Sequence, residues 1–534
     1  MNEGIQINKL IFPLQRFPTS ANNSDLQADQ TNPAICLYGR RFYKDQTPVE
    51  YLSEFLLVFA SQKNEKKEGC YQFNLNHDNS IAPRYWPEDK VALKLFSFFP
   101  YSKLETRHQV HRTAYLDAIN TVKEKINGAA EDKEEVVRLI QSLFAGFVGV
   151  AKNRTWVTYS FLPASTSLLA REVHWEHQRA LKEKNKEICD WESSKDFFSD
   201  NMRSFMGRGG ELLYLQIVNF FSHANSNDIQ QLLTLNEYKH LVYQVNNLQL
   251  RLENGLRQFL EESFNQLGVL VNLIETTLDD YKINKTLKSS SFGWIPKNTY
   301  IEAALFTFEM DNIVLSNLGL LDKLDLLQTL CSFQVLRSLC FQARRVDDTE
   351  KTTPGFIGNY VWIVTDSTAN MSEPIRQMSQ NSFKLIDSML YRVLRIPNLF
   401  PNNIKPKPED FKNGDDNVFK HFRKFSKEIG LVIPPKGTGE RFTLHQGLLR
   451  FLVAALVRPG ERIRLNHFYQ RVFAHYGIAL GAEQLAVALK WCGNEEEADT
   501  YCVTANTTWI EEALQQGGFL VELSDAVSMV KNPG

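Results

Sequence analysis

The sequence predicts a mainly α-helical, multidomain protein. A chain of 534 residues normally divides into about three or four domains of roughly 150 residues each. Its apolar fraction of 43% is enough for several buried cores. Through the middle of the chain, apolar side chains recur at helical spacing. We therefore expect a mixed α/β N-terminal domain over 1–125, a mainly helical domain over 126–400, a linker over 401–417 and a C-terminal domain over 418–534.

The N-terminal domain combines strand-like and helical patterns. The stretch AICLYGRRFY, residues 34–43, is typical of a strand that runs into a turn. The stretch TPVEYLSEFLLVFAS predicts a helix with a well-defined start. Thr47 can cap it, Pro48 suits the first helical position, and Glu50 lies three residues beyond the cap.

The central domain is expected to be a helical bundle. Residues 237–281 place apolar side chains at a spacing close to three and a half residues, which predicts a long helix with a narrow apolar seam. Gly255 and Gly268 weaken it as a free-standing coiled coil, so its partner should be a helix of the same chain, such as residues 312–341. The β-branched run within 358–374 predicts one strand or an insertion, and the absence of a fixed-period repeat disfavours a solenoid.

Residues 395–417 collect Pro, Asn, Lys and Asp without apolar periodicity, which predicts the linker. Beyond it, helices are expected at 443–457, 465–477 and 481–493, with candidate strands TYCVTA and GFLVEL on either side of NTTWIEEALQQ. Three helices followed by a late pair of strands resemble a winged-helix module over roughly residues 441–525. The resemblance rests on the order of the elements, because this fold has no invariant residue signature.

Any contact with DNA must be local, because 60 basic against 62 acidic residues leave no global positive field. The helix placed as a recognition helix offers only Gln484 and Lys490, and four carboxylates follow it in NEEEAD. Basic residues elsewhere in the module could hold phosphates without reading sequence. The candidate DNA-binding residues are Arg423, Lys424, Arg462, Arg464, Arg471 and Lys490. The alternative is a module used purely for protein docking.

Two histidine pairs raise the question of a metal site. His174 and His177, flanked by Glu172 and Glu176, would share one face of a helix and could ligate zinc or manganese. The same spacing recurs at 108 and 111, but no further ligand is identifiable and the HExxH signature is missing. Surface or interfacial histidines are the preferred interpretation, so neither a metal nor a cofactor is expected.

A glycine-rich stretch suggests an anion site. Gly209 and Gly210 precede a helical run and could expose backbone N–H groups, assisted by Arg203 and Arg208. Glu211 in the first turn would instead satisfy the helix end and repel a phosphate. The Walker signature is missing, which argues against an ATP-binding loop. No nucleophile motif is present either, so no catalytic residue is assigned.

Features that bear on localisation agree with one another. The first residues lack a basic region followed by an apolar one, and the most apolar later run, GLLRFLVAALV, is short and contains Arg450. Seven scattered cysteines form neither a disulfide framework nor a CxxC pair. A cytoplasmic protein without a membrane span is expected.

Two stretches, LYGRRFYKDQTPVEYLSEFLLVF and GRGGELLYLQI, resemble proteins encoded beside helicases in bacterial multi-gene anti-phage defence systems of the Druantia kind. The resemblance implies an accessory subunit of a defence complex that acts on foreign DNA, and no catalytic residues. The predicted function is a non-enzymatic scaffold or adaptor whose partners are other protein subunits, a helicase among the candidates, and double-stranded DNA. The alternatives are a metal-dependent nuclease and a transcriptional regulator.

Overall fold

The fold is mainly helical, as predicted from the sequence. The computed structural model describes residues 31–39, 46–60, 73, 84–85, 116, 119–145, 172–175, 198–202, 209–264, 293–347, 351–367, 373–400, 405–494, 507–524 and 527–533. The α-helices of the N-terminal and central parts are α2 (Pro33–Tyr38), α3 (Pro48–Ala60), α6 (Ala130–Ala145), α9 (Gly209–His223), α10 (Asn227–Thr234), α11 (Leu248–Phe264), α13 (Tyr300–Val314), α14 (Leu320–Val346) and α15 (Glu373–Val393). Those that follow are α16 (Pro408–Asn417), α17 (Phe419–Glu428), α18 (Gln446–Leu456), α19 (Leu465–Tyr476), α20 (Ala482–Cys492) and α22 (Thr508–Gln516). Short 3-10 helices are η4 (Lys239–Gln244), η6 (Lys297–Thr299) and η7 (Pro397–Leu399).

The described strands form four small sheets. Two of the sheets are antiparallel pairs: β1 (Arg84–Tyr85) with β4 (Gly293–Trp294), and β2 (Glu172–Trp175) with β3 (Phe198–Met202). A four-stranded sheet has the order β6 (Val432–Ile433), β7 (Arg441–Leu444), β5 (Trp362–Asp366), β9 (Ile478–Ala479). A three-stranded antiparallel sheet has the order β10 (Leu520–Ser524), β11 (Val527–Lys531), β8 (Arg462–Arg464).

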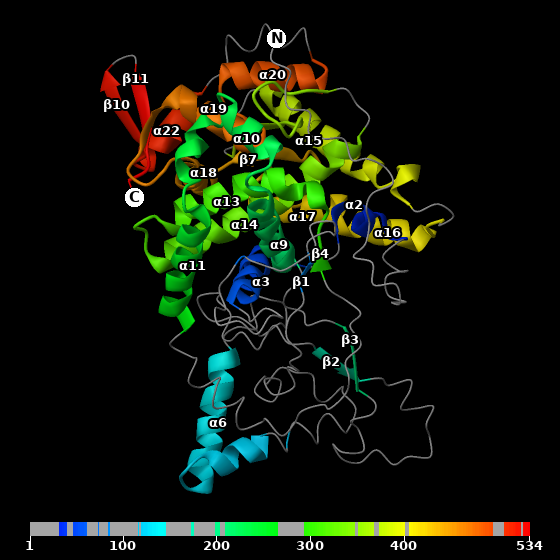
Figure 1. The fold of residues 1–534 in the computed structure, drawn as a ribbon, viewed down its shortest axis with the longest axis vertical. Coiled ribbons are helices and arrows are strands. Elements are labelled where there is room, and N and C mark those ends of the chain that lie inside the picture. Colours follow the sequence, from blue (N-terminus) through cyan, green and yellow to red (C-terminus); the bar gives the residue numbers. More distant parts are fainter. Residues whose placement is uncertain are drawn as a thin grey trace.

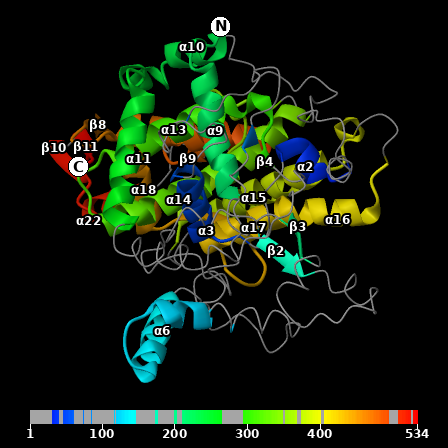
Figure 2. The same ribbon diagram turned by 60° about the horizontal axis from the view of Figure 1, so that its bottom comes forward.

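Helices α13 and α14 form the centre of the core. Almost every residue of α13 is buried, and α9, α11, α14 and α18 all pack against it. A helix that is apolar around most of its circumference belongs in the interior. Figures 1 and 2 show both helices enclosed by their neighbours, with the three-stranded sheet and helix α16 at opposite edges.

Helix α3 begins as predicted. The Thr47 backbone N–H donates to Glu50 Oε2 at 2.8 Å, and the Glu50 N–H donates to Thr47 Oγ1 at 3.4 Å, which is a reciprocal capping box. The helix then packs along α9, where a Cβ on Gly210 would lie 2.2 Å from the Phe55 backbone nitrogen. The glycines that open α9 therefore allow two helices to approach closely.

The strand predicted within residues 34–43 is wrong over its first part, because α2 occupies Pro33–Tyr38. Asn32 caps this helix by accepting from the backbone N–H groups of Ala34 and Ile35, and Pro33 takes the first helical position. These two start signals outweigh the strand-like composition of the segment.

The long helix predicted over 237–281 is interrupted. Its first part is the 3-10 helix η4, and α11 begins only after Asn247, whose φ is 57°. Residues 265–281 lie outside the described residues. Helix α11 packs on α13, with Gly255 close to the Val314 side chain, so its partner is indeed a helix of the same chain.

Of the two alternatives predicted within 358–374, a strand or an insertion, the structure has a strand, β5, which pairs with strands from distant parts of the chain. It runs parallel to both β7 and β9, which belong to the predicted C-terminal domain. Trp362 is fully buried and stacks on Phe442 of β7 at 5.6 Å between ring centroids. Side chains on both sides of the predicted boundary therefore share one core.

The linker predicted over 401–417 is helical over Pro408–Asn417. Asp410 stabilises the start of α16 by accepting from the Lys407 backbone N–H at 2.8 Å. The helix packs against α2 and α17. The segment lacks apolar periodicity because α16 is a surface helix that buries little.

Candidate nucleic-acid interface

The turn between α18 and β8 is held rigidly by one arginine. Arg471 of α19 donates to both carboxylate oxygens of Glu461, at 2.8 and 3.1 Å, and to the Leu456 carbonyl at 2.9 Å. Asn532, directly after β11, donates its side-chain amide to the Val457 carbonyl. These bonds fix the direction in which β8 leaves the turn.

Strand β8 presents two arginines to solvent. Arg462 and Arg464 are exposed, whereas Ile463 between them is buried, as strand alternation requires. On the neighbouring strand β11, Lys531 pairs with Arg462 and Met529 pairs with Arg464. Directly paired residues point to the same face, so Arg462, Arg464 and Lys531 form one cationic surface, called here the basic strand pair.

No carboxylate neutralises this surface among the described residues. Between residues 441 and 482 the sequence has six arginines and a single carboxylate, Glu461. Burial would raise the pKa of Glu461, but the hydrogen bonds and charge of Arg471 outweigh burial and lower it. Glu461 is thus an anion already paired with Arg471. Like charges that face each other across two strands destabilise a sheet slightly. The pairing of Arg462 with Lys531 therefore does not serve the stability of the sheet.

The other predicted DNA-binding residues have different surroundings. Arg423 lies 2.8 Å from Asp387, and Lys424 lies 3.4 Å from Glu428. Arg471 is bound to Glu461, so it positions β8 and offers little to a ligand. Lys490 is exposed near the end of α20, a helix that packs on α15, β5 and β9. The structure brings none of these four onto the basic strand pair, while sequence reasoning missed Lys531.

The predicted anion site at the start of α9 is taken up by the protein itself. The Gly210 N–H donates to Glu54 Oε2 at 3.0 Å, and the Gln46 amide donates to the same oxygen at 2.7 Å. Glu54 is fully buried, and Gly209 and Gly210 are buried as well. Arg203 and Arg208 lie outside the described residues. A carboxylate from α3 thus occupies the position expected for a bound anion.

The histidine pair His174 and His177 does not have the assumed helical geometry. Glu172–Trp175 is strand β2, so the argument that residues three apart share a helix face does not apply to His174. His177 lies outside the described residues, as do residues 108 and 111. Within the described part of the chain, no group of three or more His, Cys, Asp or Glu side chains is placed to hold a metal ion.

A buried ionic cluster anchors α19, and sequence reasoning missed it. Arg337 donates to both oxygens of Glu309 at 2.7 and 2.8 Å, and all three side chains of Glu309, Arg337 and His475 are almost fully buried. His475 Nδ1 lies 2.7 Å from Glu309 Oε1, and Arg337 also donates to the His475 carbonyl. The cluster ties α13 and α14 to the helix that follows the basic strand pair.

This cluster predicts a loss of stability in mild acid. Burial lowers the pKa of His475 below 6.5, assisted by Arg337 and Arg471 against the opposing effect of Glu309. The unfolded chain therefore binds more protons below pH 6.5, so stability is complete above that pH and falls as the pH drops. We expect the free energy of unfolding, measured by urea titration, to be constant from pH 8 to 7 and to decrease below about 6.5, by up to about 1.4 kcal/mol per pH unit for one histidine. His475→Asn, which keeps a donor near the Nδ1 position, should reduce that slope; an unchanged slope would contradict the assignment.

Comparisons with known protein families, characterised proteins and solved structures find no match for this chain. The geometry of the described residues is therefore the basis for a functional argument. Among their helices, none combines the length and the apolar character needed to cross a bilayer.

Proposed function

We propose that the chain is a non-enzymatic scaffold or adaptor whose C-terminal part binds the phosphate backbone of DNA without reading its sequence. The observation that carries the proposal is the basic strand pair: Arg462, Arg464 and Lys531 share one face and have no acidic partner among the residues that the structure describes. Surface cations of this kind attract phosphates, and such contacts position a protein on DNA but carry no sequence information.

The order of elements supports a winged-helix-like module as the carrier of this surface. Helix α18, strand β8, helix α19, and later α22, β10 and β11 follow one another, and β8 completes the sheet beside the β10–β11 hairpin. Helix α22 directly precedes the hairpin and packs on α18. The helix expected to read bases, α20, has its Gln484 side chain buried, which favours sequence-tolerant binding.

The wider role follows from the resemblance to accessory proteins of anti-phage systems. In that role the chain would be a cytoplasmic subunit that joins other proteins, with a helicase as the candidate partner, on foreign DNA. A scaffold of this kind needs a rigid structure and a surface that binds DNA independently of its sequence. The shared core and the clamped turn before β8 are suited to both requirements.

Charge reversal should test the proposal. We expect Arg462→Glu with Arg464→Glu to abolish binding to duplex DNA measured by fluorescence anisotropy at low salt, because it removes the two exposed cations, leaves only the half-buried Lys531, and adds two anions. For the unaltered protein, about three phosphate contacts predict a slope of roughly −3 in log K against log salt. Duplexes of unrelated sequence should bind equally.

A matched control reverses two exposed lysines elsewhere, Lys405→Glu with Lys436→Glu, and changes the net charge by the same amount. This variant should bind nearly as well as the unaltered protein. Equal losses in both double variants would mean that only overall charge matters. No binding by the unaltered protein at low salt would favour protein docking instead.

A further inference from the structure

An exposed aromatic side chain lies on η4. Tyr243 is 80% exposed, and Val242 beside it and Leu250 at the start of α11 are 45% and 59% exposed. An aromatic ring exposed to this degree is available to a ligand that has a flat or apolar face. The packing of η4 does not require Tyr243, because Leu241 and Gln244 are the residues that this helix buries.

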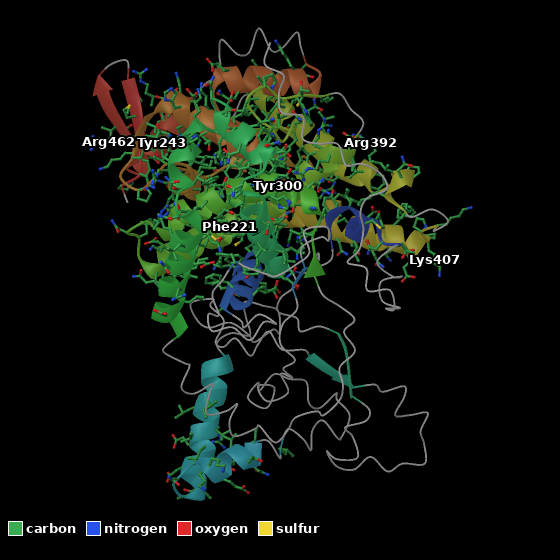
Figure 3. The ribbon with its side chains drawn as sticks, viewed as in Figure 1. Phe221, Tyr243, Tyr300, Arg392, Lys407 and Arg462 are labelled. Atoms are coloured by element: carbon green, nitrogen blue, oxygen red, sulfur yellow. The ribbon has the colours of Figure 1, made fainter. Side chains whose placement is uncertain are left out.

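Helix η4 contacts the C-terminal end of α19, the helix that follows β8 of the basic strand pair. The Tyr238 hydroxyl, just before η4, donates to the Ala474 carbonyl of α19 at 2.6 Å. The ring of His240 lies 5.7 Å from that of His475. Burial lowers the pKa of His240, and the nearby charge of Arg471 lowers it further. Arg471 in turn binds Glu461, the residue before Arg462. Figure 3 labels Tyr243 and Arg462 at the same edge of the molecule.

The charges around Tyr243 are complementary to an anionic ligand. Between residues 238 and 252 the sequence has Lys239 and Arg251 and no carboxylate; of the two carboxylates that flank this range, Glu253 is buried and Glu237 is half-buried. Lys239 is exposed, while Arg251 is bound to Asp311. A ligand that spans η4 and β8 would therefore meet exposed cations at both ends and an aromatic ring on η4.

A single-stranded nucleic acid has the chemistry that this arrangement requires. Its phosphates pair with cations, and its unpaired bases present flat faces that stack on exposed aromatic side chains. In a duplex those faces are already stacked within the helix, so a duplex could use only the cations. An acidic protein segment would pair with the cations, but it would use the ring only if it also placed an apolar side chain opposite Tyr243.

We propose that Tyr243 stacks on an unpaired base of single-stranded DNA whose phosphates are held by Arg462, Arg464 and Lys531. The inference rests on the proposed function and names its substrate class. The basic strand pair and Tyr243 act together. The basic strand pair binds the phosphates of the backbone, and Tyr243 distinguishes an unpaired strand from a duplex.

The test measures the binding of the full chain to two labelled DNAs, a single-stranded oligonucleotide of mixed sequence and the blunt duplex of that sequence. Base–aromatic stacking predicts that Tyr243→Ala weakens single-strand binding roughly tenfold and leaves duplex binding unchanged. Tyr243→Trp should retain the preference. With 2-aminopurine in the single strand, the unaltered protein should change its fluorescence, and Tyr243→Ala should not.

The outcomes separate the two proposals. If Arg462→Glu with Arg464→Glu abolishes binding of both DNAs while Tyr243→Ala leaves the ratio of the two affinities unchanged, the stacking role is overturned and backbone binding stands. Tyr243 would then be free to serve in protein docking. If neither DNA binds to the unaltered protein at low salt, both proposals fail.

Discussion

Arg337→Met is expected to lower the free energy of unfolding by about 3–5 kcal/mol, because it leaves the Glu309 carboxylate buried without its cation. The guanidinium donates to both oxygens of Glu309 and to the Gln334 side chain, so the substitution also leaves these acceptors without their donor. Urea unfolding followed by circular dichroism measures the effect.

Two further variants separate the loss of the pair from the loss of a side chain. Arg337→Met combined with Glu309→Gln removes the buried charge and should recover much of the stability, since the new amide can still accept from His475. Lys420→Met breaks an exposed helical pair with Asp416 and should cost at most about 0.5 kcal/mol. If Arg337→Met were as mild as Lys420→Met, the cluster would not be the anchor of α19.

Trp362→Ala should have a comparable effect and should extend across the predicted domain boundary. Removing a fully buried Trp costs about 3–5 kcal/mol. Because β5 pairs with both β7 and β9, we expect hydrogen exchange to accelerate together in α14 and in α19. Trp509→Ala, at a half-buried position of α22, should have a smaller and more local effect. Normal protection of α19 in the Trp362 variant would indicate that the C-terminal part folds independently.

The elements that could be predicted from the sequence depend on short-range contacts. The capping box of α3 joins Thr47 and Glu50, three residues apart, and is visible in the sequence. Helix α19 was expected over 465–477 and spans Leu465–Tyr476, because Gly477 ends it in the left-handed conformation. Helix α2 carried equally local start signals, but its apolar and aromatic composition favoured a strand.

Which cations remain available could not be predicted, because the pairing of charges depends on tertiary structure. Arg423 meets Asp387 on another helix, and Arg471 meets Glu461 across a turn. Nothing local in the sequence distinguishes these arginines from Arg462 and Arg464. Lys531 joins the surface only because β11 pairs with β8. The exposure of Tyr243 likewise follows from the way η4 breaks the predicted long helix.

The central position of β5 has a consequence for how the chain is made. The strand is synthesised well before its partners β7 and β9. The Tyr238 hydroxyl likewise cannot form its hydrogen bond until the Ala474 carbonyl, 236 residues further along the chain, has been synthesised. At about 5–20 residues per second, both edges of β5 and the buried Glu309–Arg337 pair remain without β7, β9 and His475 for on the order of ten seconds during translation. A nascent chain in this condition exposes a sheet edge that other chains can pair with, so its yield in the cell should depend on chaperones that bind ribosome-attached intermediates.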